Sequence, residues 1–456
     1  MTMSTSIHGM WSSRFAFILA ASGSAVGLGN IWRFPYTAGE YGGGAFVLVY
    51  LLCVAAIGIP IMMAEVMLGR RGRQSPINTM RTLAQAQQSP VFWQLVGWLG
   101  ILSGFLILSF YSVVGGWTLA YTLYSGLGSF SGIDAEGSAQ VFSALTNNPW
   151  QLLLWHSVFM VMIAGVVARG VASGLEQAVR FLMPALFVLL LAMVAYAATE
   201  PRAFVQGLDY MFRPDFAEFQ GRAGEAILSA MGQAFFSLSL GMGAIMMYGS
   251  YLSSQASITQ NVVIIAGMDT LVALLSGLAI FPIVLATGLE PGSGPGLIFQ
   301  TLPIAFGQMP GGQLFAVVFF VLLLVAAWTS AISLLEPLTA WLVENRDWSR
   351  PVAAITGAVL IWLLGIACLL SLNVWSDVTL FGKGFFDLFD YLTSNVLLPV
   401  GGVLIAIFSG WVLSRHISVA ELIGRDTLGY RIWRFLIRYI SPLCVTIVFL
   451  NAIGLI

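Results

Sequence analysis

Charge is scarce in this sequence. Only 9% of its 456 residues are Asp, Glu, Lys or Arg, and 19 basic against 20 acidic residues leave a formal net charge of −1. Soluble domains carry about 25% charged residues, so this composition cannot cover a globule in water. The balanced charge also argues against a partner such as nucleic acid. Because 58% of the residues are hydrophobic, we expect a lipid bilayer around the chain, with no nucleic acid and no obligate protein partner.

Cysteine and histidine are also rare. The three cysteines, Cys53, Cys368 and Cys444, each lie in an apolar run, and none belongs to a CxxC pair. This pattern is typical of small core residues and argues against a disulfide framework or a thiolate metal site. The three histidines are far apart in the sequence, and no nucleophile with a base and no phosphate-binding loop accompanies them. A membrane-embedded enzyme is therefore disfavoured.

Long apolar runs dominate the sequence instead. A helix needs about 20 mostly apolar residues to cross the hydrocarbon core of a bilayer. Eleven stretches meet this need, near 14–38, 43–69, 92–127, 150–168, 177–199, 227–252, 258–287, 311–343, 351–372, 387–413 and 433–455. The first stretch lacks the small-residue cleavage site of a signal peptide, so we interpret it as a retained helix. Residues 1–456 are predicted to form one all-α integral membrane domain.

The basic residues predict how the chain is oriented. Cytoplasmic loops retain Lys and Arg, and with the N-terminus inside, twelve basic residues fall on the inner side and four on the outer side. The other three lie within or at the edge of spans. We therefore expect a multi-pass protein of the inner (plasma) membrane with a cytoplasmic N-terminus. An odd number of spans then places the C-terminus outside.

Small and polar residues interrupt the first predicted span at about the middle of the membrane. The run 22–30 (SGSAVGLGN) holds three glycines and two serines, and each glycine costs roughly 1 kcal/mol relative to alanine within a helix. Backbone groups freed by an interruption must find partners away from lipid. Such a run either forms a binding site or lets helices pack closely through small residues. On its own it leaves both interpretations open.

A second run of this kind favours a binding site. Residues 235–243 (FFSLSLGMG) lie in the sixth span, which corresponds to the first if spans one to five and six to ten form two halves. Because five is an odd number of spans, the second unit must have inverted topology in the membrane. Paired interrupted helices in two inverted halves indicate a substrate site near the midplane. Helix N-termini there offer N–H groups to an anion. We predict repeat one at about 11–199, repeat two at about 227–413 and an extra helix at about 433–455.

Polar side chains inside other apolar spans add candidate ligands. The hydroxyls of Thr329 and Ser330, in the eighth span, either suit a weakly bound monovalent cation or bond carbonyls of their own helix. Asp269 lies within the seventh span, where a carboxylate is costly unless it is compensated. A bound cation would compensate it, and a protonated or arginine-paired structural aspartate is the alternative. Glu65 and Glu336, near the inner surface, are expected to satisfy helix ends or arginines.

The residues around the interruptions resemble the neurotransmitter:sodium symporter family. Residues 27–35 (GLGNIWRFP) are highly specific to its first helix, and they follow the pair Trp11-x-x-Arg14. Residues 236–241 (FSLSLG) and the hydroxyl pair of the eighth span are similar to further family signatures. The resemblance covers nearly the whole chain. It implies the five-plus-five inverted-repeat (LeuT-like) fold with unwound first and sixth helices and, as in a bacterial subset of amino acid transporters, eleven transmembrane helices.

The resemblance implies sodium-coupled amino acid uptake by alternating access, with two Na⁺ ions and one substrate pocket. The first sodium site would use Ala25, Asn30, Ser237 and Asp269, beside the substrate carboxylate. The second would use Gly23, Val26, Ala326, Thr329 and Ser330. The substrate pocket would be lined by Ser24, Ala25, Leu28, Gly29, Ile107, Tyr111, Phe236, Ser239, Met242, Ser330 and Leu334. In it, Tyr111 would bond the carboxylate and Phe236 would cap the pocket from outside.

Gates on both sides of the membrane are implied as well. Arg33 and Asp390 would pair across the outer mouth, unless they only anchor the protein at the interface. On the inner side Trp11 would close the pathway, and His8 would face Glu344 where relatives have an arginine.

Three further positions bear on sodium and chloride. Asp269 stands where many family members have a neutral Asn, so it supplies a negative charge that animal relatives often obtain from chloride. Ala273 replaces a glutamate that some bacterial members carry nearby. Because Asp269 already supplies the negative charge, we expect no chloride requirement. Gly174 and Pro184 are similar to a family motif that lets the inner part of the fifth helix unwind and release the second sodium ion.

The expected substrates are neutral, hydrophobic L-amino acids, because no acidic side chain is assigned to the pocket. Met242 replaces an aromatic ring that several members have there, and methionine adapts to different shapes. This favours a broad range of aliphatic and aromatic substrates. A channel or sensor with the same fold but no transport remains an alternative class, and sodium-driven uptake separates the two.

Overall fold

Helices make up most of the part of the chain that the structure describes. The computed structural model describes residues 7–214, 216, 222–286, 297–422, 427–452 and 455. Within these ranges the regular structure is helical, apart from two isolated bridges that join Gly43 to Pro214 and Leu380 to Lys383. The predicted all-α class is therefore confirmed. A span's backbone groups must be bonded within the protein in lipid, and a helix achieves this within one segment.

Nine helical segments of the described residues are long and apolar enough to cross a membrane. Four are single helices: α8 (Pro149–Ala168), α14 (Ile258–Ala286), α16 (Gly312–Arg346) and α17 (Arg350–Leu370). The others are joined from consecutive pieces: α3 (Gly44–Cys53), η2 (Val54–Gly58) and α4 (Ile59–Gly72); η3 (Val91–Trp93) and α6 (Gln94–Gly126); η4 (Val171–Glu176) and α9 (Gln177–Ala197); α18 (Phe385–Tyr391), η6 (Leu392–Leu397), α19 (Leu398–Ile407) and η7 (Phe408–Val412); α21 (Leu428–Phe435), η8 (Leu436–Ile440) and α22 (Ser441–Ala452).

Two further segments are interrupted, as the sequence predicts. The first consists of α1 (Arg14–Ala25), η1 (Gly29–Arg33) and α2 (Phe34–Glu40), with a bend of 52° at the break. The second consists of α12 (Ala223–Ser237) and α13 (Ala244–Ser250), separated by residues 238–243. The predicted number of eleven spans is reached only when α12 and α13 are taken as one interrupted span.

The observed helix ends differ from the predicted ones by a few residues. The fifth span begins at Val171 instead of near 177, because Gly170, with a positive φ of 92°, ends the preceding turn just before it. The last residues of two predicted spans, 287 and 453–454, lie outside the described residues. The repeat boundaries, about 11–199 and 227–413, stay a prediction.

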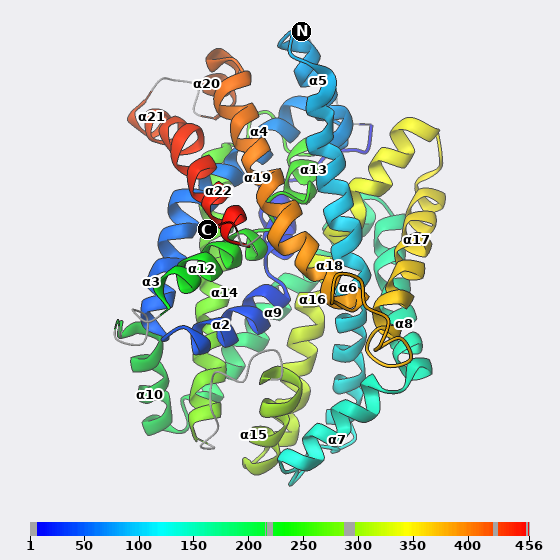
Figure 1. The fold of residues 1–456 in the computed structure, drawn as a ribbon, viewed down its shortest axis with the longest axis vertical. Coiled ribbons are helices and arrows are strands. Elements are labelled where there is room, and N and C mark those ends of the chain that lie inside the picture. The colour runs from blue at the N-terminus through cyan, green and yellow to red at the C-terminus, as the bar shows by residue number, and fades with distance from the viewer. Residues whose placement is uncertain are drawn as a thin grey trace.

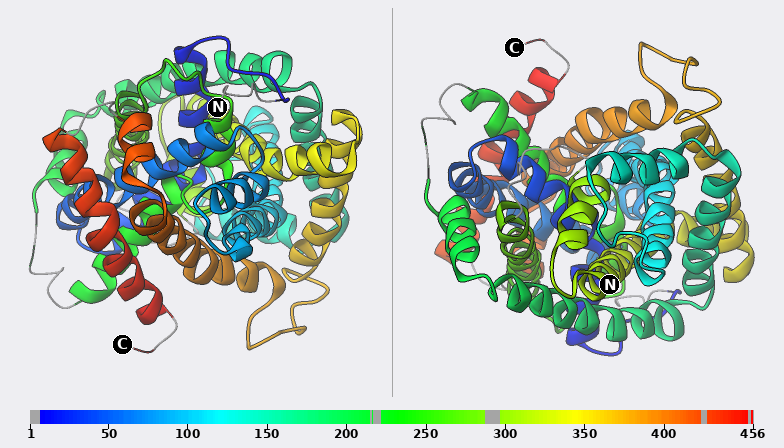
Figure 2. Two further views of the ribbon diagram at one scale, coloured as in Figure 1. Left: turned by 90° about the horizontal axis from the view of Figure 1, so that it is seen from above. Right: turned by 90° about the horizontal axis from the view of Figure 1, so that it is seen from below.

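The long helices run roughly parallel to the long axis of the molecule. Figure 1 shows α5 (Pro76–Ala86) and α20 (Arg415–Leu422) at the N-terminal end, and α7 (Ala135–Thr146), α10 (Pro201–Phe212) and α15 (Leu302–Gln308) at the opposite end. The short η5 (Leu297–Thr301) leads into α15. In the end-on views of Figure 2, many helices appear as rings seen down their axes. This is the arrangement of a membrane bundle with connecting helices at both faces.

The interrupted helices lie inside the bundle. Every residue of α1 from Ala16 to Ala25 is buried, and α1 packs against α9, α14 and α16. The helix α13 packs against α4. Within the most apolar window of each span, 67% of α16 is buried but only 28% of the span Val171–Ala197. The breaks are thus shielded from lipid by other helices, which is the condition for non-helical backbone at membrane depth.

Candidate functional site

The break in the first span is held by polar side chains from other helices. The carbonyl of Ser24 accepts hydrogen bonds from the hydroxyls of Ser239 (2.8 Å) and Ser330 (3.0 Å). The carbonyl of Gly29 accepts one from the amide nitrogen of Gln233 (2.7 Å). Carbonyls that a continuous helix would use internally therefore bond α12, α16 and the second break.

The break in the sixth span has a left-handed backbone. Ser239, Gly241 and Gly243 have φ values of 54°, 79° and 74°, a region that glycine adopts freely and other residues rarely do. The amide of Gly241 donates to the carboxylate of the fully buried Glu65 (2.7 Å). The sequence predicted a helix end as the partner of Glu65, and the structure shows that this end belongs to the interrupted sixth span.

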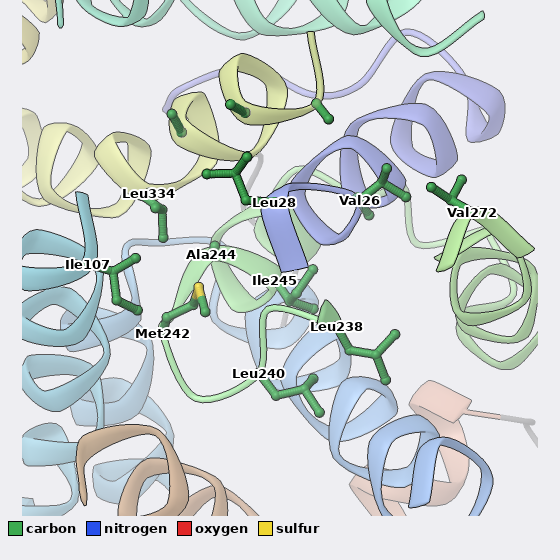
Figure 3. Close-up of a cluster of buried hydrophobic side chains, with 14 of the residues drawn as sticks. Val26, Leu28, Ile107, Leu238, Leu240, Met242, Ala244, Ile245, Val272 and Leu334 are labelled. Carbon is green, nitrogen blue, oxygen red and sulfur yellow. The ribbon is translucent and has the colours of Figure 1, made fainter. Parts of the chain in front are cut away.

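A small pocket lies between the two breaks. It is lined by ten of the eleven predicted substrate residues, together with Gly27: Ala25, Leu28, Gly29, Ile107, Tyr111, Phe236, Ser239, Met242, Ser330 and Leu334. Figure 3 shows Leu28, Ile107, Met242 and Leu334 converging at this place. Ser24 does not line it: its hydroxyl donates to Ser333 of α16 (2.7 Å), and its carbonyl is bonded by Ser239 and Ser330. The free volume is about 10 Å³, so side chains around the pocket must move to admit a ligand.

A larger cavity of about 370 Å³ lies next to this pocket. Leu28, Tyr111 and Phe236 line both spaces, so Phe236 stands between them, where it was predicted to cap the pocket. Arg33 and Asp390 also line the cavity. The ion pairs of the described residues do not include one between them, and the Arg33 guanidinium lies 5.0 Å from the centre of the Phe236 ring. The predicted outer gate is thus not formed here.

Asp269 is held by neutral donors from three helices. Its carboxylate accepts from the amide of Asn30 (2.7 Å) and from the hydroxyls of Ser237 (2.9 Å) and Tyr50 (3.4 Å). It is fully buried, and among the described residues no basic group lies within 4.0 Å of it. The arginine-paired alternative does not describe this aspartate. A negative charge in such a place calls for a cation or a proton.

The residues predicted for the second sodium site lie where α1 packs against α16. A Cβ on Gly23 would lie 3.2 Å from the Sδ of Met183 in α9 and 3.4 Å from the Cβ of Thr329, so the tightest contact of Gly23 is with α9. The hydroxyl of Thr329 donates to the carbonyls of Val325 and Ala326, both at 3.1 Å. Thr329 thus bonds its own helix, as the alternative interpretation expected, while Ser330 reaches across to α1. Val26 and Ala326 are fully buried at this contact.

The N-terminal segment closes the opposite end of the site. Trp11 is 6% exposed, lies edge-on against Tyr248 and Tyr251, and donates from its indole to the Tyr248 carbonyl (3.0 Å). The His8 ring contacts the carboxylate of Glu344 at 2.9 Å. The inner-gate residues predicted from the sequence therefore lie together. The structure is closed at the N-terminal end and hollow at the end of Arg33.

The fifth span is bonded to this segment. Ser12 donates from both its backbone N–H (3.0 Å) and its hydroxyl to the carboxylate of Glu176, the last residue of η4. Gly174 lies inside η4, and a Cβ there would approach the carbonyl of Val166 to 2.2 Å. Pro184 lies inside α9. The segment is helical here, so the unwinding predicted for it stays a prediction.

Sequence reasoning missed several residues at the site. Tyr50 contacts both Ser237 (3.2 Å) and Asp269, Gln233 bonds the first break, and Gly27 lines the pocket. A signal was available for Tyr50 and Gln233, because each is a lone polar side chain within an apolar stretch. Gly27 belongs to the predicted run 22–30 but was not assigned to the pocket, because its role there depends on the Tyr111 hydroxyl, which would lie 2.9 Å from a Cβ at this position.

The fold and the site define a class of protein: a helical membrane transporter whose central pocket lies between two interrupted helices. Residues 8–131 and 133–455 match the model of the sodium:neurotransmitter symporter family. The chain belongs to this family. It is thus a sodium-dependent symporter, and the interpretation as a transporter, not an enzyme, is confirmed.

Similar proteins agree with this assignment. The chain is 41% identical over 448 residues to YhdH, an uncharacterized sodium-dependent transporter of Bacillus subtilis, covering 98% of each chain. It is 34% identical to an uncharacterized sodium-dependent transporter of Haemophilus influenzae, covering 99% of each. The crystal structure of MhsT in complex with L-phenylalanine matches with a TM-score of 0.89 and 44% identity, over 97% of this chain and 99% of that one. The predicted LeuT-like fold is therefore confirmed.

Proposed function

We propose that this symporter imports neutral hydrophobic L-amino acids together with two sodium ions and without chloride. The observation that carries the proposal is the composition of the pocket between the breaks. Ile107, Met242 and Leu334 give one part of it an apolar wall, and Tyr111 and the backbone of the first break give another part hydrogen-bonding groups. A zwitterionic amino acid with an apolar side chain matches this division into an apolar part and a hydrogen-bonding part.

The apolar wall sets the class of substrate. None of the described residues that line the pocket is charged, and a charged substrate would be left unpaired there, at a high cost in desolvation. The complex of MhsT with L-phenylalanine supports an aromatic substrate as one member of the range. Met242 can adjust to aliphatic and aromatic side chains through its rotatable bonds.

The polar part would hold the charged end of the amino acid. The Tyr111 hydroxyl accepts a hydrogen bond from the Leu28 amide (3.2 Å) and keeps its own proton available for a carboxylate. The first sodium ion, between Asn30 and Asp269, would neutralise that carboxylate. Carbonyls of the breaks would hold the ammonium group. Since the ion and the substrate each lower the desolvation cost of the other, each raises the affinity of the other by the same factor.

The second sodium ion would bind between the end of α1 and α16, to the carbonyls of Gly23, Val26 and Ala326 and the hydroxyls of Thr329 and Ser330. Thr329 would then turn its oxygen lone pairs to the ion while its proton stays on its own helix. Hydroxyls and carbonyls without a carboxylate suit a monovalent cation.

The charge of Asp269 supports independence from chloride. Its carboxylate is buried, and its donors among the described residues are neutral. A fixed negative charge beside a sodium ion does the work that a bound anion would otherwise do. In this proposal the binding of the first sodium ion compensates Asp269, so no further anion is needed.

Transport would proceed by alternating access in the inner membrane, with the N-terminus in the cytoplasm and the C-terminus outside. The cavity beside Arg33 then opens outward, and the contacts of Trp11 and His8 close the cytoplasmic side. Formation of the pair of Arg33 with Asp390 over Phe236 would close the outer side. Loss of the Trp11 contacts and unwinding of η4 would open the inner one.

Uptake into proteoliposomes tests the proposal. Labelled leucine, phenylalanine, tryptophan, lysine and glutamate are supplied outside, with an inward sodium gradient and with chloride replaced by gluconate. We expect uptake of the first three only, with equal rates in both anions. Uptake at the same rate with and without the sodium gradient would reject the coupling of amino acid transport to sodium. Loss of uptake in gluconate would reject the role given to Asp269, and preferred uptake of lysine or glutamate would reject the substrate class.

A further inference from the structure

An arginine lies inside the last span, and no carboxylate of the described residues pairs with it. Arg438 belongs to η8, within the apolar span Leu428–Asn451. The ion pairs of the described residues do not include it, and its Nε atom is buried without a hydrogen-bond partner. Charged side chains within a span are costly and mark functional positions. The protein therefore needs an anion near Arg438, and the part of the chain that is described does not supply one.

The neighbouring helix is shaped to hold this side chain in place. The guanidinium of Arg438 lies 4.0 Å from the centre of the Trp411 ring and 5.8 Å from that of Tyr439. A Cβ on Gly410 would lie 2.8 Å from the Arg438 Cγ, so glycine leaves room for the stem of the arginine. Pro442 has no N–H for the carbonyl of Arg438 four residues earlier, and the indole of Trp411 donates to that carbonyl instead (3.2 Å).

The rings around Arg438 face the surroundings of the bundle. Trp411, Phe435 and Tyr439 are 53%, 54% and 48% exposed. Tyr439 packs against both other rings, with centroid separations of 5.6 Å each. Exposed aromatic residues of this kind gather at the level of the lipid headgroups. Arg438 thus lies beside residues of a kind that favour the depth at which a phosphate meets the upper acyl chains.

The net charge of the C-terminal part of the chain fits the same ligand. From residue 408 to the end, the sequence carries five arginines and two acidic residues. One of these acids, Glu421, already binds Arg70 (2.8 Å). Figure 1 shows α21 and α20 at the end where the N-terminus lies, the cytoplasmic end in the proposed orientation.

We propose that Arg438 binds the phosphodiester of an anionic phospholipid from the cytoplasmic leaflet. Trp411 and Tyr439 orient the guanidinium toward the headgroup, and Phe435 packs against the glycerol backbone and the first carbons of the acyl chains. A zwitterionic lipid carries its own cation next to the phosphate, so its headgroup has no net negative charge to compensate the arginine. The site should therefore prefer phosphatidylglycerol over phosphatidylcholine. This inference does not depend on which amino acid is transported.

Native mass spectrometry of the delipidated full-length protein tests the site. It is titrated with dioleoylphosphatidylglycerol or dioleoylphosphatidylcholine, and bound lipids are counted. We expect tighter binding of phosphatidylglycerol, and a roughly fivefold loss of that affinity in Arg438→Gln, the effect of one arginine near a lipid surface. Phosphatidylcholine binding should not change. Arg346→Gln removes an exposed arginine at the same end of the molecule and is the matched control.

Two more variants keep the test informative. Arg438→Lys keeps the charge and should keep most of the preference, and Trp411→Leu should weaken it if Arg438→Gln does not fold. Folding of each variant is checked by thermal stabilisation on addition of sodium. Equal binding of the two lipids by the wild type, or equal phosphatidylglycerol binding by wild type and Arg438→Gln, overturns the proposal. Dimers that Arg438→Gln abolishes, without lipid adducts, would overturn it in favour of a second copy of the chain.

Discussion

Asn30 donates two hydrogen bonds to Asp269, one to its carboxylate (2.7 Å) and one to its backbone carbonyl (3.0 Å). The oxygen of the same Asn30 amide accepts from the Gly27 amide (3.1 Å) within the first break. One side chain thus joins the interrupted helix to the buried carboxylate of α14. A cation that binds here must rearrange these bonds, and so must act on the break itself.

Asp269→Asn should weaken sodium binding by roughly tenfold or more, because a buried charge next to the ion is lost. The variant should also gain a chloride requirement, since an anion would then have to supply the missing charge. Uptake of labelled leucine against sodium concentration, in chloride and in gluconate, measures both effects. Asp209→Asn removes the same charge from an exposed position of α10 and should behave as the wild type. An unchanged sodium dependence without chloride would contradict the role of Asp269.

Tyr111→Phe should mainly weaken substrate binding. A hydrogen bond to a charged group contributes about 1.5–3 kcal/mol, so the affinity should fall about 10- to 100-fold while sodium binding alone changes little. Scintillation proximity binding of labelled leucine at saturating sodium gives the affinity. Tyr121→Phe is the control, because it removes a buried hydroxyl from the same helix, where Tyr121 bonds the Phe299 carbonyl (2.9 Å). Equal losses in both variants would show a general effect on stability.

The sequence predicted the two interruptions and most of the pocket, because glycines and hydroxyls clustered within an apolar span weaken the helix and leave polar groups that need partners. The run 22–30 and the run 235–243 each contain the observed break. The bonding of the breaks could not be predicted in the same way. That Ser239 and Ser330 both bond the Ser24 carbonyl depends on the approach of three helices, and hydrophobic periodicity carries no information on it.

Which gate is open and which is closed in the structure could not be predicted from the sequence either. Arg33 and Asp390 face one cavity without an ion pair, while His8 and Glu344 are in contact. A transporter has at least two conformations of similar free energy, and one sequence must satisfy both. Residues that pair in one of them are therefore predictable as gates, but the sequence does not select the conformation.

Ser12→Ala should loosen the fifth span at the end that contacts the N-terminal segment. The variant loses the hydroxyl bond to Glu176 and keeps the bond from the Ser12 backbone N–H. Amide hydrogen exchange of residues 171–176 should become several-fold faster in the presence of sodium, and exchange in α17 should stay the same. Glu176→Gln should have a larger effect, because both bonds then go to a neutral acceptor. Ser173→Ala removes a hydroxyl of η4 that donates to the Arg169 carbonyl at the end of the preceding span (2.5 Å) and not to the N-terminal segment. If this control exchanged as fast as Ser12→Ala, the coupling between the two segments would be disproved.

Gly69→Ala should destabilise the closed side of the transporter, where the N-terminal segment packs. A Cβ on Gly69 would lie 1.8 Å from the carbonyl oxygen of Met246, so α4 and α13 would have to move apart. Inserting a methyl group into a packed contact typically costs about 1–3 kcal/mol, and here the obstacle is backbone that cannot rotate away. Because α13 carries the carbonyl that holds the Trp11 indole, the displacement should also release the N-terminal segment.

Thermal unfolding in detergent and proteolysis of the N-terminal segment measure the two effects of Gly69→Ala. Gly165→Ala is the control: a Cβ there would have no neighbour within 4 Å, and alanine is the better helix former by roughly 1 kcal/mol. The control should therefore unfold at the same or a higher temperature and resist protease as the wild type does. A Gly69→Ala protein with the stability of the control would mean that α4 and α13 can separate freely, and the tight contact at Met246 would then not hold the inner gate.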